Sequence, residues 1–253
     1  MTSILDQFLW VIYPYISLTI MVVGLVYRYS KDKLRISSES SEILEKRTLR
    51  YGSLLFHWGL IVVILGHFAG FLIPISVYNS LGVAPETYHL LAGLLGGIFG
   101  AAAVIGVIIL LARRLYYDRV RRNSNFADFF VLFLLLIITL LGLYLTLGYN
   151  TIYGVYEYRL TVGPWIRGLI TLTPNASLMN SVPLPFKIHI LISFLLYPAI
   201  PFTRLTHLFS LPIQYPFRRP IIVRYRSREY ATTRGNISDV RPSSNETGKS
   251  EDS

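Results

Sequence analysis

The sequence contains no cysteine among its 253 residues. The chain therefore offers no disulfide, no thiolate ligand for an iron–sulfur cluster and no catalytic thiol, which leaves histidine as its main ligand for a soft metal ion. Charge is scarce as well, because Asp, Glu, Lys and Arg make up 15% of the residues while hydrophobic residues make up 53% and the mean hydropathy is +0.49. This composition is too apolar for an ordinary soluble domain.

The apolar residues come in five long blocks that contain no Asp, Glu, Lys or Arg. A hydrocarbon core of ~30 Å needs about 20 helical residues, and each block supplies them, the last by continuing to Phe209. We therefore predict an all-α integral membrane protein with five transmembrane helices. The first block is interpreted as a retained helix, because it lacks the basic start and the cleavage site of a secretory signal. The helices are expected at about residues 5–28, 52–74, 88–112, 127–148 and 185–209.

The basic residues are distributed unevenly between the two ends of these helices. Lys and Arg number seven in residues 28–50, five in 113–125 and eight after residue 207, against none in 1–27, none in 74–89 and three in 148–187. By the positive-inside rule the N-terminus lies outside and the C-terminus lies in the cytoplasm, so a multi-pass protein of the cytoplasmic membrane is expected. The net charge of +10 follows from this topology, and no nucleic-acid partner is expected.

Two segments outside the apolar blocks have distinct compositions. The outer connection from Tyr149 to Lys187 is rich in tyrosine and holds Trp165, so part of it is expected to lie along the lipid headgroups as an aromatic belt. Residues 1–228 form the predicted membrane domain. Residues 229–253 have the composition of a polar, disordered tail, to which no chemistry is assigned.

Four of the five histidines lie in or at the predicted spans, where a polar ring needs a partner. His57 and His67 differ by ten positions, a rise of ~15 Å, so the second helix offers ligands at two depths. His189 and His207 differ by eighteen positions, a rise of ~27 Å over five whole turns, so both leave the fifth helix on one face. Because the two helices run in opposite directions, His57 is expected to face His207 and His67 to face His189.

These pairs predict a helical bundle with two six-coordinate haems, each held between two imidazoles and suited to electron transfer. The unequal rises require the fifth helix to tilt or kink, and Pro198 and Pro201 lie where a kink is expected. Two alternatives remain. The rings form hydrogen bonds between the helices of a haem-free anchor or transporter, or they bind zinc, which prefers four clustered ligands. Two depth-matched pairs favour haem.

Glycines recur every seven residues beside the histidines of the second helix, at Gly52, Gly59 and Gly66. They would let either a flat macrocycle or another helix backbone approach this helix closely. Packing of helices through small residues is the more common reason for such a pattern.

Four segments are specific enough to compare with known families: IYPYI at 12–16, LFHWGLIVVILGHFAGFLIP at 55–74, RRLYYDRVR at 113–121 and PFTRLTHLFSLPIQY at 201–215. With them the chain resembles, to about Arg228, the cytochrome b (gamma) subunit of membrane-bound respiratory nitrate reductase. The resemblance implies five helices, two haems b, quinol oxidation, and docking onto an iron–sulfur (beta) subunit that serves a molybdenum catalytic (alpha) subunit. The alternative is a related dihaem quinol subunit of a sulfur or heterodisulfide redox complex, whose helices would look alike.

The resemblance also assigns the four histidines residue by residue. His57 and His207 match the ligands of the haem nearer the soluble partners, here named the proximal haem. His67 and His189 match the ligands of the second haem, named the distal haem. This assignment agrees with the pairing expected from depth.

Three arginines at the inner membrane face are candidates for contacts with haem propionates. Arg204 lies three residues before a proposed haem ligand, and Arg113 and Arg114 end the third apolar block. Simple anchoring at the inner face of the membrane explains these arginines equally well.

The resemblance places the quinol site beside the distal haem, near the outer surface, where some members use a lysine at the start of the third helix. Residues 74–91 contain no lysine. The polar candidates around this site are His67, Glu86, Tyr88 and His89. Because an imidazole exchanges protons near neutral pH, His89 is the candidate acceptor of a quinol proton, although a histidine at the start of a helix is more often an ordinary interface residue.

Overall fold

The computed structural model describes residues 3–31 and 45–209, and every regular element in these two ranges is helical, as predicted. The described residues fall within one compact unit, Met1–Leu211. The predicted polar tail at residues 229–253 lies outside the described residues.

Five helices among the described residues are long and apolar enough to cross a membrane, which confirms the predicted number of spans. The first runs through α1 (Ile4–Gln7), the π-helical turn η1 (Phe8–Ile12) and α2 (Tyr13–Lys31). The second and third are α3 (Arg47–Leu72) and α5 (Pro85–Tyr116). The fourth runs through α7 (Phe126–Leu143), η2 (Tyr144–Tyr149) and α8 (Asn150–Tyr153), and the fifth contains α10 (Leu184–Ala199).

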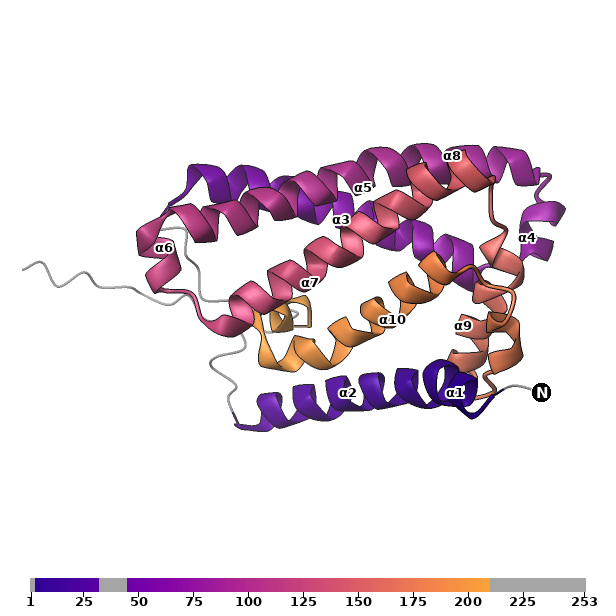
Figure 1. The fold of residues 1–253 in the computed structure, drawn as a ribbon, viewed down its shortest axis with the longest axis horizontal. Coiled ribbons are helices and arrows are strands. Elements are labelled where there is room, and N and C mark those ends of the chain that lie inside the picture. The colour runs from indigo at the N-terminus through magenta and orange to yellow at the C-terminus, as the bar shows by residue number, and fades with distance from the viewer. Residues whose placement is uncertain (1–2, 32–44, 210–253) are drawn as a thin grey trace, which may run out of the picture. The chain divides into compact units, whose positions relative to one another are not determined.

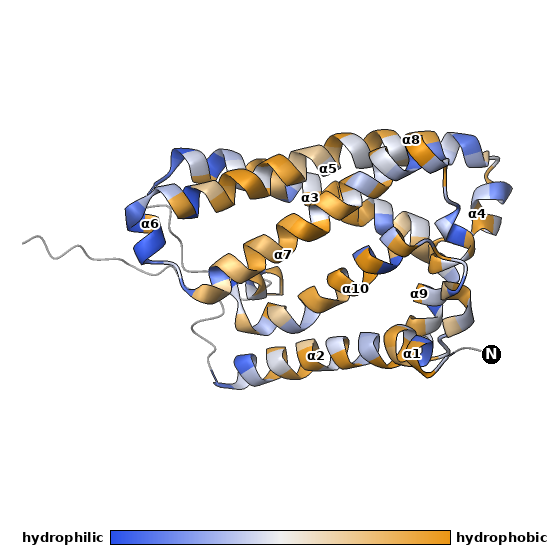
Figure 2. Cartoon of the chain, viewed as in Figure 1, coloured by the Kyte–Doolittle hydropathy of each residue, from blue (hydrophilic) through white to orange (hydrophobic). Residues whose placement is uncertain are grey.

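Most of the length of these helices is hydrophobic (Figure 2), and many of their large apolar side chains are exposed. On α5, Leu90, Leu94 and Ile98 follow one another at intervals of one turn, and each is more than half exposed. An exposed apolar stripe of this kind is unfavourable in water and favourable against the acyl chains of a bilayer. The chain is therefore a multi-pass membrane protein.

Short helices and turns join the spans at their two ends (Figure 1). At one end, α6 (Asp118–Arg122) joins α5 to α7. At the other end, α4 (Ile75–Ser80) joins α3 to α5, while η3 (Tyr158–Leu160), α9 (Val162–Ile170) and η4 (Ala176–Met179) lie between α8 and α10.

The two helices that carry the histidines are held by different neighbours. α10 packs on α2 and α7, between which it lies in Figure 1, whereas α3 packs along α5 and against α9. Glycines on α3 allow the close approach to α5, because a Cβ on Gly59 would lie 2.6 Å from the backbone nitrogen of Ala103 and one on Gly52 would lie 2.9 Å from Ile109. A Cβ on Gly66 would meet nothing within 4 Å. Gly52 and Gly59 thus serve helix packing, whereas Gly66 borders open space.

Part of the connection between α8 and α10 packs into the protein. Trp165 is fully buried, with its ring edge-on to that of Trp10 at a centroid distance of 5.9 Å. Its Nε1 donates a hydrogen bond of 2.8 Å to the carbonyl of Trp10. The predicted aromatic belt is therefore wrong for Trp165, because the indole N–H has a backbone partner inside the protein and needs no water.

The fifth span leaves the α-helical path earlier than the expected end at residue 209. α10 ends at Ala199, and the chain continues as two 3₁₀ turns, η5 (Ile200–Phe202) and η6 (Arg204–Leu208). Between them Thr203 has an extended backbone, with φ −125° and ψ −179°. The physical reason lies in Pro198 and Pro201, which both lack the N–H that an α-helix needs to continue.

Candidate functional site

The four histidines in or at the apolar helices form two facing pairs. His57 on α3 faces His207 on η6, with 6.1 Å between the ring centroids and 59° between the ring planes. His67 on α3 faces His189 on α10, with 6.4 Å between the centroids and 31° between the planes. The structure thus brings the histidines together in the pairs that the sequence predicts.

The early end of α10 explains how both pairs form at matching depths. From His189 to Ala199 the helix rises ~15 Å, which equals the rise from His57 to His67. Beyond Ala199 the chain turns through η5 and η6, and His207 comes to lie opposite His57. The mismatch between ~15 and ~27 Å that the sequence implies is thereby removed at the two prolines.

The separation within each pair suits one metal ion between two imidazoles. With metal–nitrogen bonds of about 2.0 Å and a ring nitrogen about 1.1 Å from its centroid, two rings across one ion have centroids about 6.2 Å apart. The observed separations are 6.1 and 6.4 Å. No group of three or more His, Asp or Glu that could hold a metal occurs among residues 3–31 and 45–209, so these two-ligand sites suit a haem iron better than zinc.

Backbone carbonyls determine which ring nitrogen carries the hydrogen in three of these four histidines. In each, Nδ1–H donates to a carbonyl three or four residues earlier: His57 to Ser53 at 2.7 Å, His67 to Val63 at 2.7 Å and His207 to Arg204 at 2.6 Å. Because a carbonyl oxygen can only accept, the lone pair of each neutral ring lies on Nε2. Hydrogen bonds of this kind orient histidines that ligate metals.

His189 has a different environment. Its Nδ1 is buried and has no hydrogen-bond partner. Its ring lies beside Gly142 of α7, where a Cβ would come within 3.3 Å of the imidazole Cε1. Glycine at this position gives the ring its room, and no hydrogen bond at Nδ1 fixes the tautomer of His189.

The histidines of α3 border open space. His57 and His67 are exposed although they lie on an apolar membrane helix, and Gly66 beside His67 would tolerate a Cβ without contact. α3 packs mainly on α5 and α9, whereas α10 packs mainly on α2 and α7, so the facing histidines come from helices with different main packing partners. These observations fit a macrocycle that lies against α3 near Gly66.

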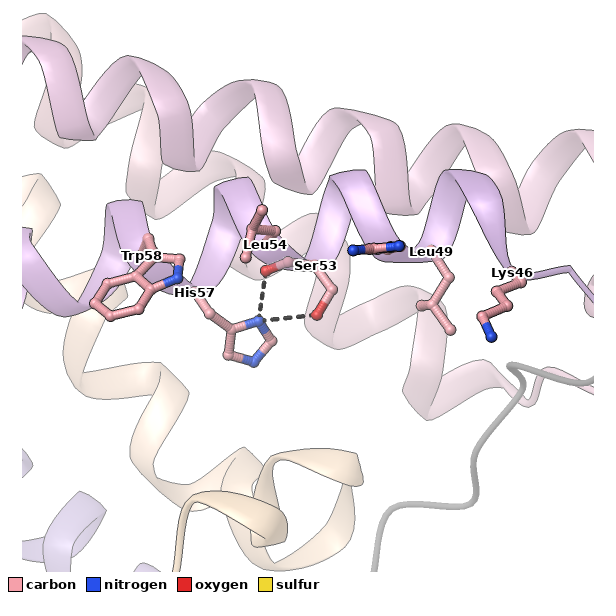
Figure 3. A pocket seen from close by; sticks show the side chains of 7 residues that line it. Lys46, Leu49, Ser53, Leu54, His57 and Trp58 are labelled. Atoms are coloured by element: carbon pink, nitrogen blue, oxygen red, sulfur yellow. Dashed lines mark hydrogen bonds between the residues drawn. The ribbon is translucent and has the colours of Figure 1, made fainter.

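A hollow of about 380 Å³ lies at the start of α3 (Figure 3). Its lining consists of Lys46, Leu49, Arg50, Ser53, Leu54, His57 and Trp58. Figure 3 shows the ring of His57 pointing away from the helix axis, with both of its hydrogen bonds ending on Ser53. Two basic side chains, Lys46 and Arg50, therefore line the same hollow as a candidate metal ligand.

The three arginines chosen from the sequence bind carboxylates of this chain. Arg113 donates from Nε to Glu45 at 2.8 Å. Arg114 and Arg204 both donate to Asp128, from Nη1 at 3.1 Å and from Nε at 2.6 Å respectively. These ion pairs join the starts of α3 and α7, the end of α5, and η6.

A second polar cluster lies around His89, at the opposite end of the spans. His89 Nε2 lies 2.8 Å from Glu157 Oε2, and Arg159 contacts the same carboxylate through Nε at 2.7 Å and Nη2 at 2.6 Å. Burial of Glu157 opposes its ionisation, but the hydrogen bonds from Arg159 and His89 outweigh burial and lower the pKa of Glu157 to about 2. The carboxylate is therefore ionised near neutral pH and accepts the hydrogen of His89 Nε2.

Aromatic rings connect this cluster to the His67–His189 pair. Tyr158 packs edge-on against Phe71 at 5.7 Å, and Phe71 packs in the same way against His67 at 5.3 Å. The hydroxyl groups of Tyr158 and Tyr88 lie 2.9 Å apart, and the guanidinium of Arg159 lies 3.9 Å from the centre of the Tyr88 ring. Burial and the adjacent Tyr88 raise the pKa of Tyr158, so this hydroxyl stays protonated.

Sequence reasoning named His89 and Tyr88 but missed their partners from the outer connection. Glu157 is the sole acidic residue of the sequence between positions 148 and 187, and it precedes Arg159 by two positions. A glutamate and an arginine two positions apart, in a connection with no other acidic residue, are the signal that would have indicated this part of the cluster. Glu86, the remaining candidate, is exposed in the first turn of α5.

Comparison with known proteins gives consistent matches over most of the chain. Residues 6–226 match the model of the nitrate reductase gamma subunit family. The chain is 47% identical over 221 residues to the nitrate reductase gamma chain of Bacillus subtilis (strain 168), which covers 87% of this chain and 99% of that protein. It is 36% identical over 228 residues to the respiratory nitrate reductase 2 gamma chain of Escherichia coli (strain K12), covering 89% of this chain and 100% of that protein. It is 32% identical over 223 residues to the respiratory nitrate reductase 1 gamma chain of the same organism, covering 88% and 98%.

Proposed function

This chain belongs to the nitrate reductase gamma subunit family, and we propose that it is the dihaem cytochrome b that oxidises quinol for a respiratory nitrate reductase. The observation that carries the proposal is the presence of two imidazole pairs, with centroids 6.1 and 6.4 Å apart, at two depths between the helices. The chain would anchor the complex in the cytoplasmic membrane. Electrons would leave it for an iron–sulfur (beta) subunit and then for a molybdenum catalytic (alpha) subunit.

The four histidines would hold the two haems. His57 and His207 would hold the proximal haem b, and His67 and His189 the distal haem b. A haem b held between two imidazoles would supply one-electron transfer. The carbonyl bonds to Nδ1 keep three of the rings in a fixed orientation, and Gly142 makes room for the fourth.

The hollow beside His57 is the proposed location of the propionate groups of the proximal haem. Lys46 and Arg50 line it together with His57, and an ammonium and a guanidinium are suitable partners for two propionates. Arg113, Arg114 and Arg204 have carboxylates of the protein as their partners. We therefore propose Lys46 and Arg50 as propionate contacts because they line the same hollow as His57.

The cluster around His89 supports a quinol site beside His67. Oxidation of a quinol releases two electrons and two protons. Because His89 donates Nε2–H to ionised Glu157, its Nδ1 carries the lone pair and can accept a quinol proton. The Glu157 carboxylate stabilises the resulting imidazolium, and Arg159 keeps that carboxylate ionised.

The basic residues support an orientation in which protons and electrons leave on opposite sides. The end of the spans that bears α6, with Arg119, Arg121 and Arg122, would face the cytoplasm, and the cluster around His89 would face outward. Protons would then leave outside while electrons pass inward. Each charge that crosses in this way stores about 2.3 kcal/mol per 100 mV of membrane potential.

A reduced-minus-oxidised spectrum of the purified membrane complex, recorded with a quinol as the reductant, tests this function. We expect a haem b band that develops when the quinol is added. A complex that contains no haem b would overturn the proposal, and so would haem that a chemical reductant reduces but a quinol does not.

A further inference from the structure

The ligand His207 differs from the other three histidines because it does not lie on a membrane helix. It lies in η6, a single 3₁₀ segment that follows a break in the fifth span. Regular α-helical hydrogen bonds therefore do not fix its position, and short 3₁₀ segments are less well held than α-helices. Other contacts must hold this segment if His207 is to stay opposite His57.

Asp128, at the start of α7, provides such a contact. Its side chain is 2% exposed, and its Oδ1 accepts a hydrogen bond of 2.6 Å from Arg204 Nε, at the first position of η6. Its Oδ2 accepts from Arg114 Nη1 of α5 at 3.1 Å and from the backbone N–H of Asn125 at 3.2 Å. One buried carboxylate thus joins α5, α7 and η6.

A short path connects this carboxylate to the imidazole of His207. The carbonyl of Arg204, whose side chain Asp128 holds, accepts the Nδ1–H of His207 at 2.6 Å. That hydrogen bond keeps the lone pair of the neutral ring on Nε2, the atom that faces a metal when Nδ1 is bonded to the protein. Asp128 therefore acts on His207 through both the side chain and the backbone of Arg204.

The location of Asp128 argues for a specific role. An ionised carboxylate buried at the edge of a membrane span is unfavourable unless cations and hydrogen bonds compensate it, and such residues commonly carry a function. The preceding segment η5 is held from α2, where Arg28 Nη1 donates to the carbonyl of Pro201 at 2.7 Å. The arginine of α2 contacts η5, whereas Asp128 holds the segment that bears the histidine.

We propose that Asp128 is a positioning residue of the proximal haem: by holding Arg204 it orients His207 opposite His57. The proposal rests on the function proposed above. It concerns one haem of the two, because His67 and His189 lie on α3 and α10 and do not depend on η6.

Haem content and potentiometric titration of the purified complex test the proposal with Asp128→Asn and with Asp118→Asn as the control. Asparagine keeps the shape of the side chain but removes the charge that holds both arginines. We expect Asp128→Asn to lose the proximal haem and keep the distal haem at its wild-type potential, so the haem content falls to about half. Asp118 forms an exposed pair with Arg121 at 2.8 Å, and Asp118→Asn should retain both haems.

A second variant keeps the test decisive if Asp128→Asn does not accumulate. Arg204→Gln removes the contact with η6 but leaves Asp128 paired with Arg114, and we expect the same selective loss of the proximal haem. Two haems at wild-type potentials in Asp128→Asn would overturn the proposal, as would loss of both haems together in Arg204→Gln. If Arg204 instead served the haem as a direct propionate partner, Asp128→Asn would keep both haems. A wild-type complex without any haem b would refute the proposed function itself.

Discussion

The imidazole rings of His67 and His189 face each other with 6.4 Å between centroids and 31° between planes, although one lies on the second span and the other on the fifth. The second pair, His57 and His207, has nearly the same separation but a tilt of 59°. Both rings of the first pair lie on α-helices, whereas His207 lies on a 3₁₀ segment held by ion pairs. One proposed haem would therefore be held by histidines of two α-helices. The other would be held by one histidine of an α-helix and one of a 3₁₀ segment that the Arg204–Asp128 ion pair anchors.

Substitution of Gly59 tests the packing that holds α3 in place. A Cβ at position 59 would lie 2.6 Å from backbone atoms of Phe99 and Ala103, and backbone cannot move aside cheaply. We expect Gly59→Ala to destabilise the protein by about 1–3 kcal/mol, as overpacking does, and to lower its thermal unfolding temperature in detergent. Gly93→Ala on α5 is the control, because a Cβ at position 93 would meet nothing within 4 Å. Equal unfolding temperatures for the two variants would contradict the packing described here.

Substitution of Arg50 tests the proposed propionate contact. Removal of a cation near a haem favours the oxidised, more positive state, so Arg50→Gln should lower the potential of the proximal haem. A change of about 40 mV is expected, which for one electron corresponds to roughly 1 kcal/mol. Arg47 lies on the same turn of α3 but does not line the hollow, so Arg47→Gln serves as the control in the same redox titration. An unchanged potential in Arg50→Gln would remove this contact from the proposal.

Replacement of His89 tests the proton acceptor. We expect His89→Ala to slow quinol-driven haem reduction by about 10²-fold or more, the usual contribution of a general base. Reduction by a chemical reductant that releases no proton should be unchanged, which separates proton transfer from haem content. Thr87→Ala, an exposed position in the same helical turn, provides the control. Wild-type rates of quinol-driven reduction in His89→Ala would exclude His89 as the acceptor.

The lowered pKa of Glu157 predicts how stability depends on pH. The carboxylate has an ordinary value near 4.5 when unpaired and about 2 in the folded protein, so its ionised form stabilises the fold. This contribution is fully present above about pH 4.5 and is lost as pH falls toward 2. The difference in unfolding temperature between wild type and Glu157→Gln should therefore be largest near neutral pH and shrink at about pH 3. A difference that grows on acidification would contradict the ion pair.

The sequence alone predicted the spans and the histidine pairs because both depend on short-range regularities. Runs of apolar residues specify membrane helices, and a fixed rise per residue relates His57 to His67 without any knowledge of tertiary contacts. The end of α10 was less predictable. Pro198 and Pro201 indicated a bend, but their position alone did not show that the chain would continue in 3₁₀ turns.

The partners of the charged side chains could be identified only from the structure, because those partners are distant in the sequence. Arg113 and Arg114 were candidates for propionate contacts from their position at the membrane face, whereas their ion pairs with Glu45 and Asp128 depend on how α3, α5 and α7 meet. Trp165 was misplaced for the same reason. Its hydrogen bond to Trp10 joins residues that are 155 positions apart, and no local pattern indicates it.

The haem content of the purified complex, measured for the wild type and for His57→Ala and His67→Ala, tests the dihaem proposal most directly. The wild type should contain two haems b for each copy of this chain. His57→Ala should lose the proximal haem and His67→Ala the distal haem, each retaining the other at its own potential. A wild-type complex without haem b, or variants that both retain two haems, would contradict the assignment of these histidines as ligands.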